Sequence, residues 1–259
     1  MDKHSLPFVE MGPHTPADVS PESSTQVDVS FFVPCLNEEK HVNGVIEKLI
    51  SVCNGLSLSY EILIVDDGSS DKTVETVTAF QDANPDAWVR LLVNKVNQGI
   101  ARNFVEAAFQ GRGKYYRLVC GDDVEPEETL HAILSKLGNA DIVIPYHTHV
   151  EGRSLWRRLV SKTYTKLVNI ASGQKLHYYN GLPLYLRRDV MRFHVEATGL
   201  GYQAEFLLRL LQENRSYEQI PLTAMDREGS VALSVRNFIS VGYTLFKILV
   251  KRIRGAVFD

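Results

Sequence analysis

The 259-residue sequence has few cysteines, no long uninterrupted apolar run and no excess of basic residues. Its three cysteines, Cys35, Cys53 and Cys120, are too few and too scattered for a disulfide framework or a cysteine-rich zinc site, and they suit a reducing compartment. The longest apolar stretch, Phe238–Val250, contains Lys247 and is shorter than the ~20 residues that a membrane span needs. No apolar run near the N-terminus has the features of a secretory signal. We therefore expect a cytoplasmic protein that is soluble or bound peripherally to the cytoplasmic face of a membrane.

The charge balance excludes a globally basic nucleic-acid-binding protein, because 28 Lys and Arg face 31 Asp and Glu, a net charge of −3. The charge is nevertheless uneven. Residues 151–175 carry a net charge of +5 and residues 234–259 a net charge of +4. Two basic zones on an otherwise acidic chain predict a local anionic partner.

The chain organisation is typical of an α/β fold. Residues 1–26 are rich in Pro, Ser and Thr without periodicity, which predicts a disordered tail. Beyond them, short apolar runs alternate with segments of helical spacing, a pattern that predicts a mostly parallel sheet with helices on both faces. The predicted strands are 29–33, 60–65, 88–93, 115–119 and 141–145, and the helices between them are 39–52, 71–83, 98–110 and 126–137.

The alternation breaks near residue 146, so we expect one compact unit over 27–230 with two halves, 27–145 and 146–230. The second half is predicted to contain helices over 154–172 and 202–212 and short strands over 182–186 and 217–221. A basic amphipathic helix is predicted over 231–259, with apolar side chains on one side and Lys and Arg on the other. Such a helix suits an anionic membrane interface, although it could equally pack on the protein or on another subunit.

Polar residues follow each of the first four predicted strands, at the sheet edge where ligands bind in such folds. Asp66 and Asp67 follow the second strand, and a Gly-Ser-Ser turn then opens a helix whose N-terminus favours anions. Arg102 is placed to meet a phosphate. Asp122 and Asp123 follow the fourth strand and offer the hard oxygen ligands that Mg²⁺ or Mn²⁺ prefers on a diphosphate. Taken singly, each group is also compatible with an ordinary capped turn or a solvated surface.

Four segments resemble, in order and spacing, the family 2 glycosyltransferases of the GT-A fold. They are VPCLNEE (33–39), VDDGSSDKT (65–73), NQGIARN (97–103) and CGDD (120–123). The resemblance implies a nucleotide-diphospho-sugar donor bound by Pro34, Asn37, Glu38, Asp66, Asp67, Gly99 and Arg102. It also implies a metal, Mg²⁺ or Mn²⁺, held by Asp122 and Asp123. Cys120 stands where the first Asp of the family's Asp-x-Asp motif usually lies, so Asp122 becomes the leading metal and catalytic residue.

The second half is similar to polyprenyl-phosphate sugar synthases of the dolichyl-phosphate mannose synthase type, through segments 152–169, 178–190, 201–211 and 220–230. Arg153, Arg157 and Ser161 share one face of the predicted helix at i, i+4 and i+8, beside an apolar stripe. Guanidinium groups beside an apolar surface suit a lipid phosphate, whereas spacing alone also permits a solvated basic face. Arg227 matches a late Arg of the family and is expected to bind phosphate.

The resemblance implies inverting transfer of a sugar to a lipid phosphate, with the sugar and the choice of UDP or GDP left open. Glu205 matches the family's position for a general base, which a hydroxyl acceptor requires and a phosphate acceptor does not. Transfer to a sugar or polysaccharide hydroxyl is thus a second hypothesis. A non-catalytic nucleotide-sugar-binding protein is a third, prompted by Cys120. A nucleotidyltransferase is disfavoured because no glycine-rich, Lys-bearing loop follows the first strand.

Overall fold

The computed structural model describes residues 9–11, 27–151, 155–192 and 201–225. They fall into two compact units. Of these residues, those up to Leu137 and Leu184–Arg192 form the first unit, and those between Gly138 and Pro183 and over 201–225 form the second. The predicted division into consecutive halves near residue 146 differs from this arrangement. The first unit ends at Leu137 rather than near residue 146. It also includes Leu184–Arg192 from the predicted second half, because β7 (Leu184–Leu186) in this segment pairs with β5 (Tyr115–Leu118).

The sheet of the first unit has the strand order β1-β4-β3-β2-β5-β7. Its centre consists of β2 (Val29–Cys35), β3 (Tyr60–Asp66), β4 (Val89–Val93) and β5 (Tyr115–Leu118), which pair in parallel as predicted. The flanking strands β1 (Val9–Met11) and β7 (Leu184–Leu186) run antiparallel to β4 and β5. The central strands are mostly apolar on both faces and almost fully buried, as expected for a sheet covered by helices on both sides.

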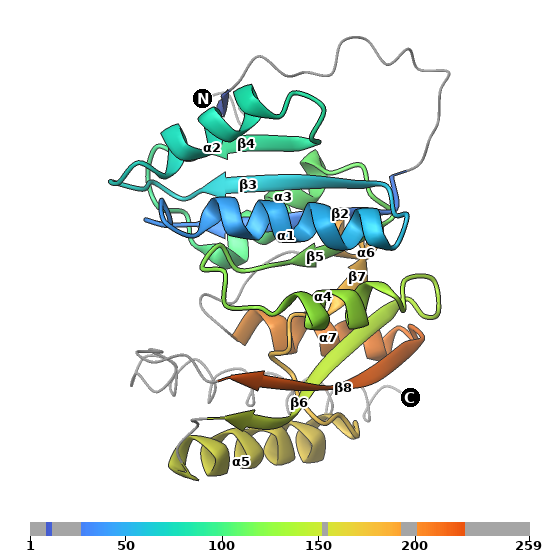
Figure 1. Cartoon of the computed structure of the whole chain (residues 1–259). Helices are drawn as coiled ribbons and strands as arrows, with labels where there is room; N and C mark the ends of the chain where they lie inside the picture. Colours follow the sequence, from blue (N-terminus) through green and yellow to red (C-terminus); the bar gives the residue numbers. More distant parts are fainter. Residues whose placement is uncertain (1–8, 12–26, 152–154, 193–200, 226–259) are drawn as a thin grey trace, which may run out of the picture. The chain divides into compact units, whose positions relative to one another are not determined.

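Helices cover both faces of this sheet (Figure 1). On one face, α1 (Val42–Gly55) contacts α2 (Thr73–Ala83) and α4 (Glu127–Leu134). On the other, α3 (Ile100–Gln110) contacts α6 (Arg187–Met191). Each central strand therefore leads into a helix through a loop at its carboxyl end, which places the four polar loops at one edge of the sheet.

Strand β1 lies within the stretch for which we predict disorder, and the prediction is wrong for these three residues. Val9, Glu10 and Met11 pair with Val93, Leu92 and Leu91 of the edge strand β4. The backbone groups of β4 that would otherwise form an open edge are thereby hydrogen-bonded. The composition of the segment does not indicate this strand, because β1 forms only by pairing with the edge strand β4.

The second unit contains two parallel strands, β6 (Ile142–Glu151) and β8 (Tyr217–Met225), whose register shifts between His147 and His149. Its helices are α5 (Leu155–Ser172) and α7 (Gly201–Gln212), close to the predicted ranges. Within the described residues, no helix combines the length and the apolar character that crossing a membrane requires. The predicted C-terminal helix over 231–259 lies outside the described residues.

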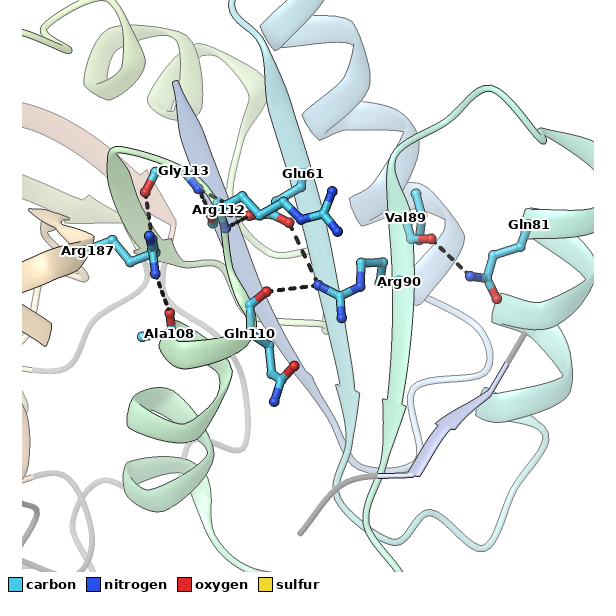
Figure 2. A network of polar contacts seen from close by, with 10 residues as sticks. Glu61, Gln81, Val89, Arg90, Ala108, Gln110, Arg112, Gly113 and Arg187 are labelled. Carbon is cyan, nitrogen blue, oxygen red and sulfur yellow. Dashed lines mark hydrogen bonds and ion pairs between the residues drawn. The ribbon is translucent and has the colours of Figure 1, made fainter. Parts of the chain in front are cut away.

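A buried polar network fixes the sheet of the first unit at the edge opposite the four polar loops (Figure 2). The carboxylate of Glu61, which is 1% exposed, accepts hydrogen bonds from the Ser30 hydroxyl at 2.5 Å and from the backbone N–H groups of Arg112 and Gly113. Arg187 donates to the carbonyl oxygens of Gly113 at 2.7 Å and Ala108 at 3.0 Å. These contacts tie the start of β5 to β2, β3 and α6, so we assign the network a structural role.

Candidate functional site

The candidate site lies at the carboxyl ends of the four parallel strands of the first unit. Each of the loops that follow these strands contains one residue with positive φ: Asn37 (61°), Gly68 (84°), Gly99 (84°) and Asp123 (57°). Gly adopts this conformation at little cost, and Asn and Asp are the side chains that tolerate it best. The sharp turns let polar backbone and side-chain groups crowd at one edge of the sheet.

Asn37 joins the loop after β2 to the loop after β3. Its side-chain oxygen accepts hydrogen bonds from the backbone N–H of Ser70 at 2.8 Å and of Asp71 at 3.3 Å, and its own N–H donates to the Ser69 hydroxyl at 2.9 Å. The backbone N–H of Glu38 likewise donates to the Thr73 hydroxyl at 2.9 Å. Asn37 and Glu38 therefore hold the shape of the loop after β3, which begins with Asp66 and Asp67.

Asp71 provides the second tie between these loops. Its carboxylate accepts hydrogen bonds from the backbone N–H of Glu39 at 3.1 Å and from the Thr73 hydroxyl at 2.5 Å. Burial acts to raise the pKa of Asp71, but the hydrogen bonds from Thr73 and Glu39 outweigh it and hold the pKa below its ordinary value. The charged form of Asp71 is thus the form that stabilises the loop.

Asp66 ends β3 and is 1% exposed. Its Oδ2 accepts the backbone N–H groups of Gly68 at 3.2 Å and Ser69 at 3.0 Å. Its Oδ1 is buried and has no hydrogen-bond partner among the residues that the structure describes. A buried carboxylate oxygen without a donor is costly unless a ligand or water supplies one, so Asp66 offers an acceptor to a bound molecule.

Asp67 has a different set of contacts. Its Oδ1 accepts hydrogen bonds from the backbone N–H of Gln98 at 2.7 Å and the side-chain amide of Asn94 at 2.9 Å, and its Oδ2 accepts the N–H of Gly99 at 3.0 Å. The Asn94 amide also donates to Asn103 at 2.9 Å. Both oxygens of Asp67 therefore fasten the loop between β4 and α3 to the end of β3.

Arg102 lies in the first turn of α3 with its side chain 53% exposed. Its guanidinium group donates to Glu106 at 2.6 Å and to the Gln98 side chain at 2.7 Å. The structure thus places Arg102 beside the loop that Asp67 fastens. Two exposed contacts of this kind contribute little stability, so a phosphate can compete for the guanidinium group.

The turn after β5 carries the predicted metal residues. Asp122 is half-buried and accepts the Val124 N–H at 3.4 Å, whereas Asp123 forms an ion pair with Lys48 of α1 at 2.8 Å. The preceding Gly121 packs against β2, since a Cβ there would lie 2.8 Å from the carbonyl oxygen of Pro34. Pro34 thus contributes its backbone to the base of this turn.

The donor set of this turn suits a divalent cation that is shared with a ligand. Asp122 supplies hard carboxylate oxygens, and Cys120 is a soft ligand that Mg²⁺ does not favour. Among the described residues, no three His, Cys, Asp or Glu side chains gather closely enough to hold a metal ion by themselves. The residues present fit a metal whose remaining ligands come from the diphosphate of a bound nucleotide.

The residues predicted for the acceptor belong to the second unit or lie outside the described residues. Arg157 and Ser161 are on α5, where Ser161 is half-buried, and Glu205 is half-buried on α7. Arg153 and Arg227 lie outside the described residues. The residues predicted for the donor therefore belong to the first unit, and the roles of both sets of residues stay predictions.

Three features of the site were not predicted from the sequence. Asn94 and Asn103 are 2% and 0% exposed and complete the network around Asp67. Asn94 directly follows β4, so the expectation that polar residues at the carboxyl ends of parallel strands belong to the site could have identified it. Lys48 carried no signal, because a Lys on an amphipathic helix is usually solvated.

Comparison with known proteins agrees with this geometry. Residues 30–194 match the family described as Glycosyl transferase family 2. The undecaprenyl-phosphate 4-deoxy-4-formamido-L-arabinose transferase of Pectobacterium carotovorum is 23% identical over 86% of this chain and 66% of its own length. The protein of the same name from Yersinia enterocolitica is 26% identical over 88% of this chain and 69% of its own length. The chain spans about two thirds of the length of these curated relatives.

Solved structures share the fold at low sequence identity. Glucosyl-3-phosphoglycerate synthase from Mycobacterium tuberculosis, solved with Mg²⁺ and UDP, matches with a TM-score of 0.66 and 17% identity over 86% of this chain and 79% of that one. TarS of S. aureus, residues 1–349, matches with a TM-score of 0.59 and 18% identity over 86% of this chain and 65% of that one. These likenesses support the GT-A fold expected from the sequence. With the family match covering more than half of its length, the chain belongs to glycosyl transferase family 2.

Proposed function

We propose that this glycosyltransferase moves a sugar, with inversion, from a nucleotide-diphospho-sugar to a polyprenyl phosphate. The observation that carries the donor half of the proposal is Asp66, whose buried Oδ1 has no hydrogen-bond partner among the described residues. A nucleobase N–H is a donor of the required kind. Arg102 and the N-terminus of α3 lie one loop away, where they would face the phosphates.

Asp122 would hold a divalent cation, Mg²⁺ or Mn²⁺, together with the donor's diphosphate. The M. tuberculosis synthase has been solved with UDP and either Mg²⁺ or Mn²⁺, which supports both ions as candidates. Such a cation supplies charge stabilisation to the departing nucleoside diphosphate. The protein's own contribution is the turn after β5, which places the Asp122 carboxylate at the same sheet edge as Asp66.

The acceptor half of the proposal draws on the relatives that are named undecaprenyl-phosphate transferases and on the surface of α5. Leu159, Leu167 and Ile170 are 56%, 47% and 63% exposed, and Lys162 and Lys166 on the same helix are exposed as well. Apolar side chains interleaved with Lys suit the headgroup region of an anionic bilayer. We therefore propose that α5 contacts the membrane from its cytoplasmic face, with Arg153, Arg157, Ser161 and Arg227 near the lipid phosphate.

The experiment is a nucleoside-diphosphate release assay with UDP- and GDP-sugars, Mn²⁺ and a short-chain polyprenyl phosphate. We expect release that depends on the lipid phosphate. Because a phosphate acceptor is already anionic, Glu205→Gln should keep most of the activity, like the control Glu213→Gln near the exposed end of α7. Release without the lipid, or loss of about a hundredfold or more in Glu205→Gln alone, would favour a hydroxyl acceptor. Nucleotide binding without release under any condition would favour a non-catalytic protein.

A further inference from the structure

The turn that carries Asp122 is held by one side chain of helix α1. The ammonium group of Lys48 lies 2.8 Å from Asp123 Oδ1 and donates to the carbonyl oxygens of Glu125 at 2.8 Å and Asp123 at 3.5 Å. Lys48 is 21% exposed and Asp123 33% exposed, so the pair is partly shielded from water. Three oxygens of a single turn thus converge on one cation of the protein.

A second contact fixes the same carboxylate against α1. A Cβ at Gly44, one helical turn before Lys48, would lie 2.6 Å from Asp123 Oδ2, so the carboxylate rests on the helix where a side chain is absent. Asp123 itself has a φ of 57°. This left-handed backbone, together with Gly44 and Lys48, sets the direction of the Asp123 side chain toward α1.

The C-terminal end of the turn, at Glu125, is held by a side chain of β5. Arg117 of β5 is 0% exposed and binds Glu125 through two nitrogen–oxygen contacts of 2.6 and 3.0 Å. This paired geometry is the strongest form of Arg–carboxylate contact. Lys48 and Arg117 therefore hold Asp123 and Glu125 as protein ion pairs on either side of Val124.

We propose that Lys48 is a positioning residue that withholds Asp123 from the divalent cation and so makes metal binding depend on the nucleotide. The inference rests on the proposed donor site. An ammonium group at 2.8 Å cancels much of the attraction that Asp123 would exert on a second cation. With Cys120 in place of a further carboxylate, the turn attracts Mn²⁺ weakly until a diphosphate adds its own oxygens. The coupling is reciprocal, so Mn²⁺ also tightens nucleotide binding.

The test measures Mn²⁺ binding by the electron paramagnetic resonance signal of the free ion, with and without UDP or GDP. In the wild-type protein, the nucleotide should tighten Mn²⁺ binding at least tenfold. Lys48→Met should tighten Mn²⁺ binding to the nucleotide-free protein by roughly five- to tenfold, because the negative charge of Asp123 is then no longer offset. The double variant Lys48→Met/Asp123→Asn should return to the wild-type value, and Lys48→Arg should resemble the wild type.

The matched control is Lys40→Met, which removes an exposed positive charge near the same sheet edge and should leave Mn²⁺ binding within about twofold of wild type. Unchanged or weaker Mn²⁺ binding in folded Lys48→Met would overturn the inference. So would a tenfold loss of Mn²⁺ affinity in the nucleotide-bound Asp123→Asn variant, since Asp123 would then be a ligand. If neither UDP nor GDP changes Mn²⁺ binding in the wild type, the proposed donor site itself fails.

Discussion

The carboxylate of Asp67 accepts the backbone N–H of Gly99 at 3.0 Å, although 32 residues separate them in the sequence. The same side chain accepts donors from Gln98 and Asn94, so three N–H groups converge on two oxygens. The sequence resemblance assigned Asp67 to direct nucleotide contact. The contacts give this side chain a structural role, because it builds the loop against which a nucleotide would lie.

Asp67→Asn should therefore damage both stability and nucleotide binding. Either orientation of the new amide places its NH₂ group against an N–H donor, leaving at least one buried group unsatisfied. We expect a loss of about 1–3 kcal/mol in the free energy of unfolding, together with weaker UDP or GDP binding, measured by urea denaturation and calorimetry. Asp82→Asn, at an exposed position of α2, is the control. Wild-type stability in Asp67→Asn would contradict the assignment.

The Arg117–Glu125 pair should behave as a buried ion pair. Arg117→Met leaves the carboxylate of Glu125, which is 18% exposed, without its guanidinium partner. We expect a loss of about 3 kcal/mol or more in the free energy of unfolding, and the double variant Arg117→Met/Glu125→Leu should recover part of it. Urea denaturation of the two single variants and the double variant checks the coupling. Additive effects would show that the two side chains act independently.

Asp71 should make the loop after β3 more stable above its ordinary pKa of 3.8 than below it. Because the folded-state pKa is lowered, this contribution is present above pH 3.8 and is lost as the pH falls through the folded value. The stability difference between wild type and Asp71→Asn should therefore shrink as the pH falls below 3.8. Chemical denaturation between pH 7 and pH 3 measures it, with Asp86→Asn as the exposed control. A constant difference would refute the linkage.

The three cysteines should differ in reactivity. Burial, followed by the nearby Asp66, raises the pKa of the Cys35 thiol, and burial together with Asp28 raises that of Cys53 to about 12. Neither should react with iodoacetamide at about pH 8 in the folded protein, since the thiolate is the reactive form. Cys120 is partly exposed and should be labelled.

Peptide mass spectrometry can follow this labelling with and without nucleotide. UDP or GDP with Mn²⁺ should slow modification of Cys120, because the residue lies in the turn that is proposed to meet the diphosphate. The unfolded protein, in which all three thiols react, is the control. If Cys120 is labelled equally fast at saturating nucleotide, the donor does not bind at this turn.

The sequence predicted the central elements of the first unit because apolar strands and amphipathic helices alternate there with little ambiguity. It also located the polar loops, because parallel strands end at a common edge. It could not predict β1, whose pairing depends on the exposed edge of β4, or the return of β7 to the first unit. The boundaries of such additions are set by tertiary pairing, which local periodicity does not encode.

Within the site, the sequence identified which residues cluster but not which of them contact each other. Asp66 and Asp67 are adjacent and chemically identical. Yet one presents a buried oxygen without a partner among the described residues, and the other is saturated by backbone donors. Asp122 and Asp123 are also adjacent and have different contacts, since Asp122 accepts the Val124 N–H and Asp123 pairs with Lys48. These distinctions depend on the direction of each side chain, which follows from loop geometry and from helix α1.

The transfer of labelled sugar from a nucleotide-diphospho-sugar to a polyprenyl phosphate tests the account most directly. The assay compares the lipid phosphate with the matching lipid alcohol in the presence of Mn²⁺ and follows the label into the organic phase. The account predicts a labelled lipid with the phosphate, no product with the alcohol, and loss of product in Asp122→Asn. Label transferred equally to the alcohol, or product formation unaffected by Asp122→Asn, would contradict it.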